Sequence, residues 1–349
     1  MPVSVHEPRA NLPIVAECDV VVVGGSLAGF AAAARASANG LSVVIIEERG
    51  SLGREAWASL QLFPRPCDQG ELPPVGLEIR ERLSAVNAWT DRCFDAPALQ
   101  VLLDKMAAER HIPTYFQAYG EQVLRGEAGA LHVILGNKSG RQALRCRCVV
   151  DATENARMLA SADPSALVND PGDGVIRRSM LVVGAQMQHP ERIAFNVPDT
   201  FGTTDGRVRA RQALWPGDAA VWADFGDISG PDDWIERETF RRMTRIAALL
   251  HETSSEFHRS SLMFVAHDPL WLRGRSLAGE VSPTHTLPFV LKSGAVHAVP
   301  LPAAWLDPHA AGDIVACGPC LRDDALSAAD YADFGNALRL GDACALHLA

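Results

Sequence analysis

The stretch Asp19-Val-Val-Val-Val-Gly-Gly-Ser-Leu-Ala-Gly29 decides the fold expected of this chain. Its valine run is typical of a parallel strand that is buried on both faces. A G-x-S-x-x-G turn follows, with Ser26 at its middle position, and an alanine-rich helix then runs to Gly40. A second apolar strand over residues 41–46 ends at Glu47. Strand, glycine turn, helix and strand in this order predict a Rossmann-like dinucleotide-binding unit.

Each position of this turn has a physical role. Gly24 permits the tight turn, and Gly29 lets the helix pack closely on the strand. Ser26 stands where a second glycine lets the backbone approach a pyrophosphate, and the helix start then offers free N–H groups to phosphate. Glu47 is positioned to accept hydrogen bonds from a ribose. The alternative interpretation is a Rossmann unit that has lost its nucleotide, which Ser26 favours.

Composition sets the broad class of protein. The 349 residues are 48% apolar with a formal charge of −10, so we expect one large or two smaller domains and no nucleic-acid or membrane partner. The sequence shows no apolar run of membrane-spanning length and no signal-peptide pattern near its start, which predicts a cytoplasmic protein. Its eight cysteines are then expected to be reduced thiols, and no metal site is predicted.

Helix and strand patterns continue along the chain. Residues 50–74 are rich in glycine and proline and predict a long, functional loop. Asp95 is positioned as the N-cap of a helix over residues 95–110. We expect further helices at 75–88, 232–253 and from about 334, and strands at 114–118, 122–125, 131–135, 143–150, 180–188, 219–225, 262–266 and 313–317.

Four segments carry a resemblance to a known family. Residues 19–29, 43–55, 149–154 and, more loosely, 313–320 resemble FAD-dependent oxidoreductases of the glutathione-reductase-like superfamily. The specific likeness is to the subgroup known simply as FAD-dependent oxidoreductases. It implies an α/β fold: a Rossmann-like FAD-binding domain with a parallel sheet, and a second substrate or cap domain that contains a β-sheet. FAD is the implied cofactor.

The resemblance also implies which residues meet FAD. The glycine turn would meet the pyrophosphate, Glu47 the ribose, and Arg54 either a phosphate or the flavin, although an ordinary solvent-exposed arginine is equally consistent with the sequence. The chain departs from the family at Gly318-Pro319, where such proteins often carry Gly-Asp; Gly341-Asp342 is too deep in the last helix to replace it. The implied set is Gly24, Gly25, Ser26, Leu27, Ala28, Gly29, Glu47, Glu48, Arg49, Arg54, Val123, Ala152, Thr153, Gly318, Gly335 and Asn336.

Catalytic residues are less well defined by the sequence. Arg275 is a candidate for binding a substrate carboxylate, and His285 and His297 are candidates for proton transfer, but surface or structural roles are the default for each. Cys317-Gly-Pro-Cys320 matches a redox dithiol in its letters, without a thioredoxin-like context around it. We treat these thiols as packing residues unless the structure shows otherwise.

The sequence therefore predicts a discontinuous FAD-binding domain at residues 13–60, 95–165 and 305–349, with residues 61–94 and 166–304 forming the substrate or cap domain. The expected function is an FAD-dependent oxidoreductase that moves two electrons between a small organic substrate and FAD. The alternatives are a flavin-dependent monooxygenase that uses NAD(P)H and O2, and a non-catalytic accessory subunit derived from a flavoprotein. A homodimer or a complex with a partner subunit remains open.

Overall fold

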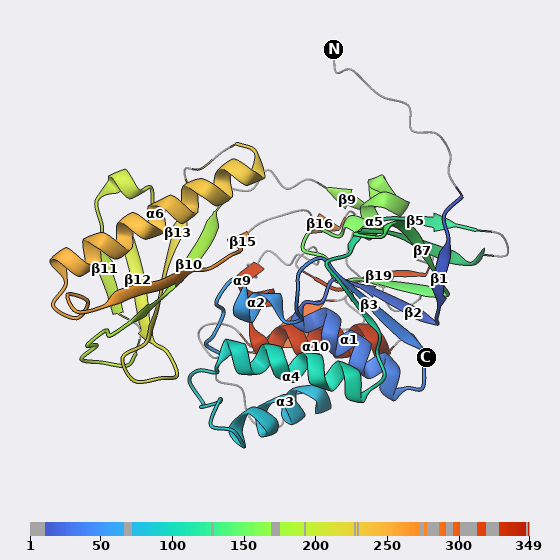
Figure 1. Cartoon of the computed structure of the whole chain (residues 1–349), viewed down its shortest axis with the longest axis horizontal. Helices are drawn as coiled ribbons and strands as arrows, with labels where there is room; N and C mark the ends of the chain where they lie inside the picture. Colours follow the sequence, from blue (N-terminus) through green and yellow to red (C-terminus); the bar gives the residue numbers. More distant parts are fainter. Residues whose placement is uncertain are drawn as a thin grey trace, which may run out of the picture.

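Two bodies make up the part of the chain that the structure describes (Figure 1). The structure is a computed structural model. Its described residues are 11–65, 72–126, 129–168, 175–191, 193–226, 228, 230–271, 276–277, 286–290, 296–300, 313–318, 328–346 and 348.

The first body is built on a five-stranded parallel sheet in the order β19-β8-β2-β3-β4. The valines of its central strand are at most 1% exposed. Val20 and Val22 join the core on one face of the sheet, and Val21 and Val23 join the core on the other. The predicted doubly buried strand is therefore confirmed. The strands are β2 (Val20–Val23), β3 (Val43–Glu47), β4 (Thr114–Phe116), β8 (Cys148–Asp151) and β19 (Ile314–Ala316).

Four helices cover one face of this sheet (Figure 1). Asp95 caps the longest of them through a 2.8 Å hydrogen bond from the Ala98 N–H to its carboxylate, as predicted. The first and last helices lie in close contact, because a Cβ added at Gly341 would lie 2.0 Å from the carbonyl oxygen of Ala28. The helices are α1 (Leu27–Ala38), α3 (Pro74–Ser84), α4 (Ala96–Glu109) and α10 (Phe334–Leu346).

A four-stranded sheet in the order β1-β7-β6-β5 covers the opposite face. The single strand expected over residues 143–150 is wrong, because the chain leaves one sheet and enters the other around Arg147. Its backbone N–H donates to Asp19 O at 3.0 Å, and the following strand pairs with β2. The strands of this sheet are β1 (Ile14–Glu17), β5 (Tyr119–Arg125), β6 (Leu131–Asn137) and β7 (Gly140–Cys146).

The second body is a six-stranded sheet, mainly in the order β11-β12-β13-β10-β14, with α6 (Asp232–Thr253) over one face (Figure 1). The helix has the predicted bounds. Ala220 and Phe264 pack against the core of the first body, so the other face of this sheet meets that body. The strands are β10 (Ile176–Val183), β11 (Ile193–Asn196), β12 (Arg207–Gln212), β13 (Ala219–Phe225), β14 (Ser261–Val265) and β15 (Leu270–Trp271), which pairs with β10.

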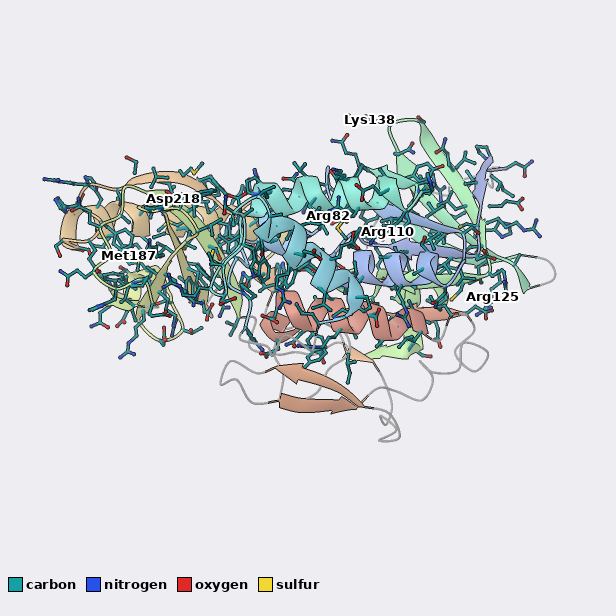
Figure 2. The ribbon with its side chains drawn as sticks, turned by 90° about the horizontal axis from the view of Figure 1, so that it is seen from below. Arg82, Arg110, Arg125, Lys138, Met187 and Asp218 are labelled. Carbon is teal, nitrogen blue, oxygen red and sulfur yellow. The ribbon has the colours of Figure 1, made fainter. Side chains whose placement is uncertain are left out.

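Helix α3 falls in a segment that we assigned to the cap, yet it packs with α1, α4 and α10 in the first body. Figure 2 shows Arg82 of α3 and Arg110, at the end of α4, close together. Arg82 binds Glu109 and Arg110 binds Glu78, so these ion pairs join the two helices. The hairpin of β17 (Thr286–Val290) and β18 (Val296–Pro300) lies against α10. The short elements are α2 (Arg54–Trp57), α5 (Arg157–Ala162), α9 (Ala328–Tyr331), β9 (Leu167–Val168) and β16 (Ser276–Leu277).

Candidate functional site

The glycine turn between β2 and α1 is tightly constrained. Gly24 has a φ of +105°, and an added Cβ would lie 2.5 Å from the carbonyl oxygen of Ala152. A Cβ at Gly29 would lie 2.0 Å from the carbonyl oxygen of Gly24. Ser26 is the N-cap of α1, since its Oγ accepts a 3.0 Å hydrogen bond from the Gly29 N–H. Both glycines are therefore required by the backbone, and the serine satisfies a helix N–H.

Glu47 closes β3 and is 2% exposed. Its Oε2 accepts a 2.5 Å hydrogen bond from the Gly25 N–H, and its Oε1 accepts one of 2.6 Å from the Arg49 N–H. Burial raises the pKa of the Glu47 carboxyl, while these two bonds oppose the rise. Each oxygen keeps further acceptor capacity, which suits a ribose hydroxyl.

The Asp-Ala-Thr segment forms a rigid turn at the end of β8. Asp151 accepts hydrogen bonds from the N–H and the Oγ1 of Thr153 at 3.1 and 2.6 Å, and from the Leu159 N–H at 2.9 Å. Thr153 Oγ1 in turn accepts one from the Arg157 N–H at 2.9 Å. Burial raises the pKa of the Asp151 carboxyl. This turn holds the Ala152 carbonyl beside Gly24.

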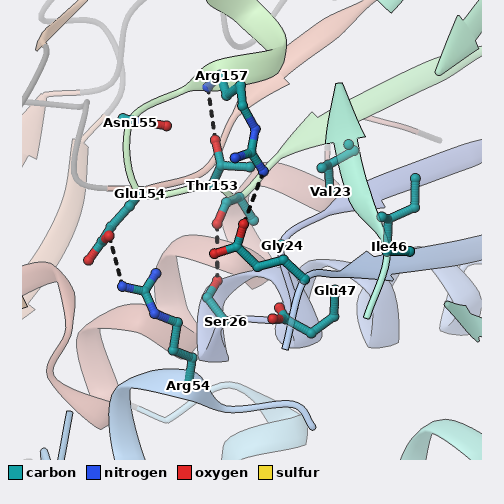
Figure 3. Close-up of a pocket in the computed structure, with 14 residues that line it drawn as sticks. Val23, Gly24, Ser26, Ile46, Glu47, Arg54, Thr153, Glu154, Asn155 and Arg157 are labelled. Atoms are coloured by element: carbon teal, nitrogen blue, oxygen red, sulfur yellow. Dashed lines mark hydrogen bonds and ion pairs between the residues drawn. The ribbon is translucent and has the colours of Figure 1, made fainter. Parts of the chain in front are cut away.

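Two cavities with shared lining residues lie beside the glycine turn and the carboxyl ends of β2, β3 and β8, and together they are called the groove here. Figure 3 shows the residues that line the first of them. The open volumes of the two cavities are about 540 and 480 Å³. The first cavity contains Glu47 and the second contains Leu270, from the second body, and Gly318. The residues that line both are Ser26, Arg54, Ala152 and Glu154. Two such cavities with shared lining residues, at the carboxyl ends of parallel strands, fit a dinucleotide.

Most of the residues implied by the resemblance lie at this groove. Those that line it are Gly24, Ser26, Ala28, Glu47, Glu48, Arg54, Ala152, Thr153 and Gly318. A second set belongs to the same turns without lining either cavity, namely Gly25, Leu27, Gly29 and Arg49.

Three implied residues lie in other surroundings. Val123 is buried in β5, and its N–H donates to Ser161 Oγ at 3.0 Å. Gly335 and Asn336 lie in the first turn of α10, where their N–H groups donate to Asp333 Oδ1 at 3.1 and 3.2 Å. The start of α10 is thus capped by the chain itself, and among the described residues neither Gly335 nor Asn336 lines the groove.

The catalytic candidates receive no structural test. Arg275 and His285 lie outside the described residues, and His297 lies in β18 with its side chain outside the description. Cys317 lines the second cavity, and its hydrogen bond with Cys344 and its burial raise its pKa well above the ordinary thiol value. Its sequence partner Cys320 is outside the described residues. Within the described ranges, no cluster of side chains could hold a metal ion.

Several groove residues escaped the sequence reasoning. The Arg157 guanidinium lies 3.7 Å from the ring centre of Tyr119 and 3.4 Å from Glu48 Oε2. Glu154 and Glu55 line the groove beside Arg54. Gly120 lines the first cavity, and a Cβ there would lie 2.6 Å from Val23 Cγ1. Only the glycine carried a local signal, since a glycine within a strand often marks a close approach.

The family comparison gives this groove its context. The family model for FAD-dependent oxidoreductases matches residues 19–257, which is more than half of the chain. The chain belongs to this family. No curated protein sequence matches it significantly.

Solved structures of similar fold include, by their names, a hydroxylase, a monooxygenase and a reductase-like protein. The aromatic hydroxylase CabE of angucycline biosynthesis superposes with a TM-score of 0.53 and 13% identity over 86% of this chain and 56% of its own. The p-nitrophenol 4-monooxygenase PnpA of Pseudomonas putida superposes with a TM-score of 0.53 and 13% identity over 88% of this chain and 73% of its own. A geranylgeranyl bacteriochlorophyll reductase-like protein of Thermoplasma acidophilum has a TM-score of 0.55 and 14% identity over 94% of this chain and 78% of its own. At these identities the likeness concerns the fold, and the chain spans little more than half of CabE.

FAD is the cofactor of this family, and the groove fits it. The glycine turn is a cradle that any Cβ would fill, and Glu47 lines the first cavity beside it. Gly318 lines the second cavity, which shares Ser26, the N-cap of α1, with the first. Among the described residues, no helix has the length and apolarity to cross a membrane.

Glu55 predicts a pH-dependent stability. Burial raises the pKa of its carboxyl, so its contribution to stability is fullest below the unfolded-state pKa and is lost as pH rises through the folded-state pKa. Glu55→Gln keeps the position neutral at every pH. We expect the FAD-free variant to unfold at a higher temperature than wild type at pH 8, with a difference that shrinks as pH falls toward about 5.

Thermal unfolding of both proteins across this pH range measures the difference. The matched control is Glu121→Gln, because Glu121 is ion-paired with Arg141 away from the groove. A Glu55→Gln stabilisation that grows toward acidic pH would contradict the assignment.

Proposed function

We propose that this protein is an FAD-dependent oxidoreductase that moves two electrons between bound FAD and a small organic substrate. The observation that carries the proposal is a pair of cavities that share Ser26, the N-cap of α1, the first lined by Glu47 and the second by Leu270 of the second body. This order of chemical groups supports an adenosine at the first cavity and a flavin at the second. The flavin end then lies where the two bodies meet.

The boundary between the two bodies supports a substrate with an apolar part. Phe63 and Trp222 have ring centres 6.0 Å apart, and Trp57 and His267 have ring centres 6.3 Å apart across the same boundary. Phe264 of the second sheet also packs on the first body. These side chains line neither cavity, but they make the boundary apolar, which favours a substrate with an apolar part over a highly charged one.

Each part of the chain has a role in this proposal. Glu47 accepts hydrogen bonds from the ribose, the start of α1 faces the pyrophosphate, and Gly318 lets the chain approach the far half of the cofactor. Bound FAD supplies the group that accepts or donates a hydride. Arg275, His285 and His297 remain proposals for substrate binding and proton transfer. A cytoplasmic location and membership of the glutathione-reductase-like superfamily also stand as proposals.

A flavin-dependent monooxygenase is the second candidate. The names of CabE and PnpA, a hydroxylase and a monooxygenase of the same fold, favour it. That activity consumes NAD(P)H and O2, whereas the first candidate exchanges electrons with the substrate itself.

Two assays on the FAD-loaded protein distinguish the candidates. Under anaerobic conditions, loss of the flavin absorbance on adding an organic substrate would support the proposed oxidoreductase. NAD(P)H oxidation that consumes O2 and depends on an aromatic substrate would support the monooxygenase. A protein that binds FAD but gives neither response across a broad substrate panel would support the accessory-subunit alternative and contradict both enzymes.

A further inference from the structure

The N-terminus of α1 is already occupied by a carboxylate of the chain. The Leu27 N–H donates a 3.0 Å hydrogen bond to Glu55 Oε2. This contact arises because the Gly53 N–H donates to the carbonyl oxygen of Gly25 at 2.7 Å, which sets the first turn of α2 against the glycine turn. Glu55 thus accepts from an N–H group that a helix start offers to a phosphate.

A second carboxylate, that of Glu154, forms an ion pair with Arg54, the residue next to Glu55. Arg54 Nη2 lies 2.8 Å from Glu154 Oε2, and both residues line the two cavities at their junction (Figure 3). Arg54 is also anchored from the other side, since its Nε donates to Asp268 Oδ2 at 2.9 Å. Asp268 is 4% exposed and binds Arg49 as well, at 3.0 Å. Arg54 is therefore held by Asp268 whether or not Glu154 stays.

Resting on the proposed function, we infer that Glu55 and Glu154 occupy the two anion positions of the pyrophosphate subsite and compete with FAD for them. On loading, the pyrophosphate takes the Leu27 N–H from Glu55 and the Arg54 guanidinium from Glu154. The Glu154 side chain can move away from Arg54, because it is 32% exposed and lies on the turn after β8. Asp268 keeps Arg54 in the groove during this exchange. The two glutamates thereby lower the affinity for the cofactor and discriminate against weaker anions.

Charge arithmetic sets the size of the effect. A glutamate that remains within a few ångströms of a phosphate repels it, more strongly in a buried site than near solvent. Replacing either carboxylate by its amide keeps the shape and removes the charge. We expect Glu154→Gln and Glu55→Gln each to lower the Kd for FAD by about tenfold, which corresponds to about 1.4 kcal/mol.

The test is a titration of the FAD-free full chain with FAD, ADP and adenosine. Calorimetry measures the binding of all three ligands, and flavin fluorescence also measures that of FAD. FAD and ADP carry the pyrophosphate, so both are expected to bind the two variants more tightly than wild type. Adenosine lacks it, so its Kd is expected to stay unchanged. Glu154→Gln is also expected to lower the unfolding temperature of the FAD-free protein, since an ion pair is lost. Glu121→Gln serves as the control with no expected change in any Kd.

The outcomes separate this inference from the proposed function. If wild type binds FAD and both variants bind it equally well or more weakly, competition by the glutamates is wrong while the flavoprotein assignment stands. If FAD and ADP bind neither wild type nor the variants, the inference and the proposed function are both wrong. Tighter binding of adenosine as well as FAD would also overturn the inference, because the effect would not then concern the pyrophosphate.

Discussion

Replacing Gly341 by alanine is expected to destabilise the protein by about 3 kcal/mol or more, with a fall in the unfolding temperature of roughly 5 °C or more. In an ordinary helix the same change stabilises by about 0.5–1 kcal/mol, so the sign itself is diagnostic. The reason is the contact between α10 and α1. A Cβ at Gly341 would lie 2.0 Å from the carbonyl oxygen of Ala28 and 2.8 Å from Ala31 Cβ, and backbone atoms cannot move aside cheaply.

The unfolding temperature of Gly341→Ala, measured by calorimetry, checks this expectation. Gly50→Ala is the matched control, because an added Cβ there meets nothing within 4 Å. Equal stability of the two variants would show that α1 and α10 are farther apart than described. Since α1 begins at the glycine turn, the Gly341 variant is also expected to lose FAD affinity.

Glu47→Gln is expected to weaken FAD binding by roughly 30- to 100-fold, or about 2–3 kcal/mol. The carboxylate accepts from two backbone N–H groups, those of Gly25 and Arg49, through different oxygens. The glutamine amide has one oxygen and one NH2 group, so one of these two backbone N–H groups would face the NH2 group instead of an acceptor. The glycine turn would shift, and the acceptor for the ribose would be lost with it.

Glu48→Gln is the neighbouring control. Glu48 is exposed, lines the same cavity and accepts from Arg157 at 3.4 Å, so its replacement removes an equal charge without a buried hydrogen bond. We expect less than about a threefold change in the Kd for FAD. Similar losses in both variants would indicate that charge at this end of the groove matters and that the bonds of Glu47 do not.

The parts of the fold that depend on local patterns could be predicted from the sequence. The valines of β2, the helix after them and the acid at the end of β3 lie within one short stretch, and their order alone specifies a nucleotide unit. Asp95 as an N-cap and the bounds of α6 follow from the same kind of local signal. The family match agrees with this stretch.

Contacts between distant segments could not be predicted in this way. Residues 143–150 have a continuous strand pattern, yet the pairing partner changes from β6 to β2 near Arg147, and nothing in the local sequence marks that change. The sequence places Gly341 deep in the last helix, and nothing in the local pattern indicates its close contact with α1. Helix α3 likewise joined the first body through tertiary packing alone.

The same limit applies to the candidate site. The sequence left Arg54 open between a cofactor contact and a solvent-exposed arginine, because its partners Glu154 and Asp268 lie far along the chain, the second of them in the second body. Val123 and Asn336 came from the resemblance, and in this chain their backbone N–H groups are bound by Ser161 and Asp333. A motif can specify the type of turn, whereas the partners of each polar group depend on the packed structure.

The visible absorption spectrum of the purified protein, with the cofactor released and identified, tests the central claim most directly. The account predicts a flavin spectrum and FAD near one per chain, either as purified or after incubation with added FAD. A colourless protein that takes up no added FAD, and whose Glu55→Gln and Glu154→Gln variants take up none, would contradict it.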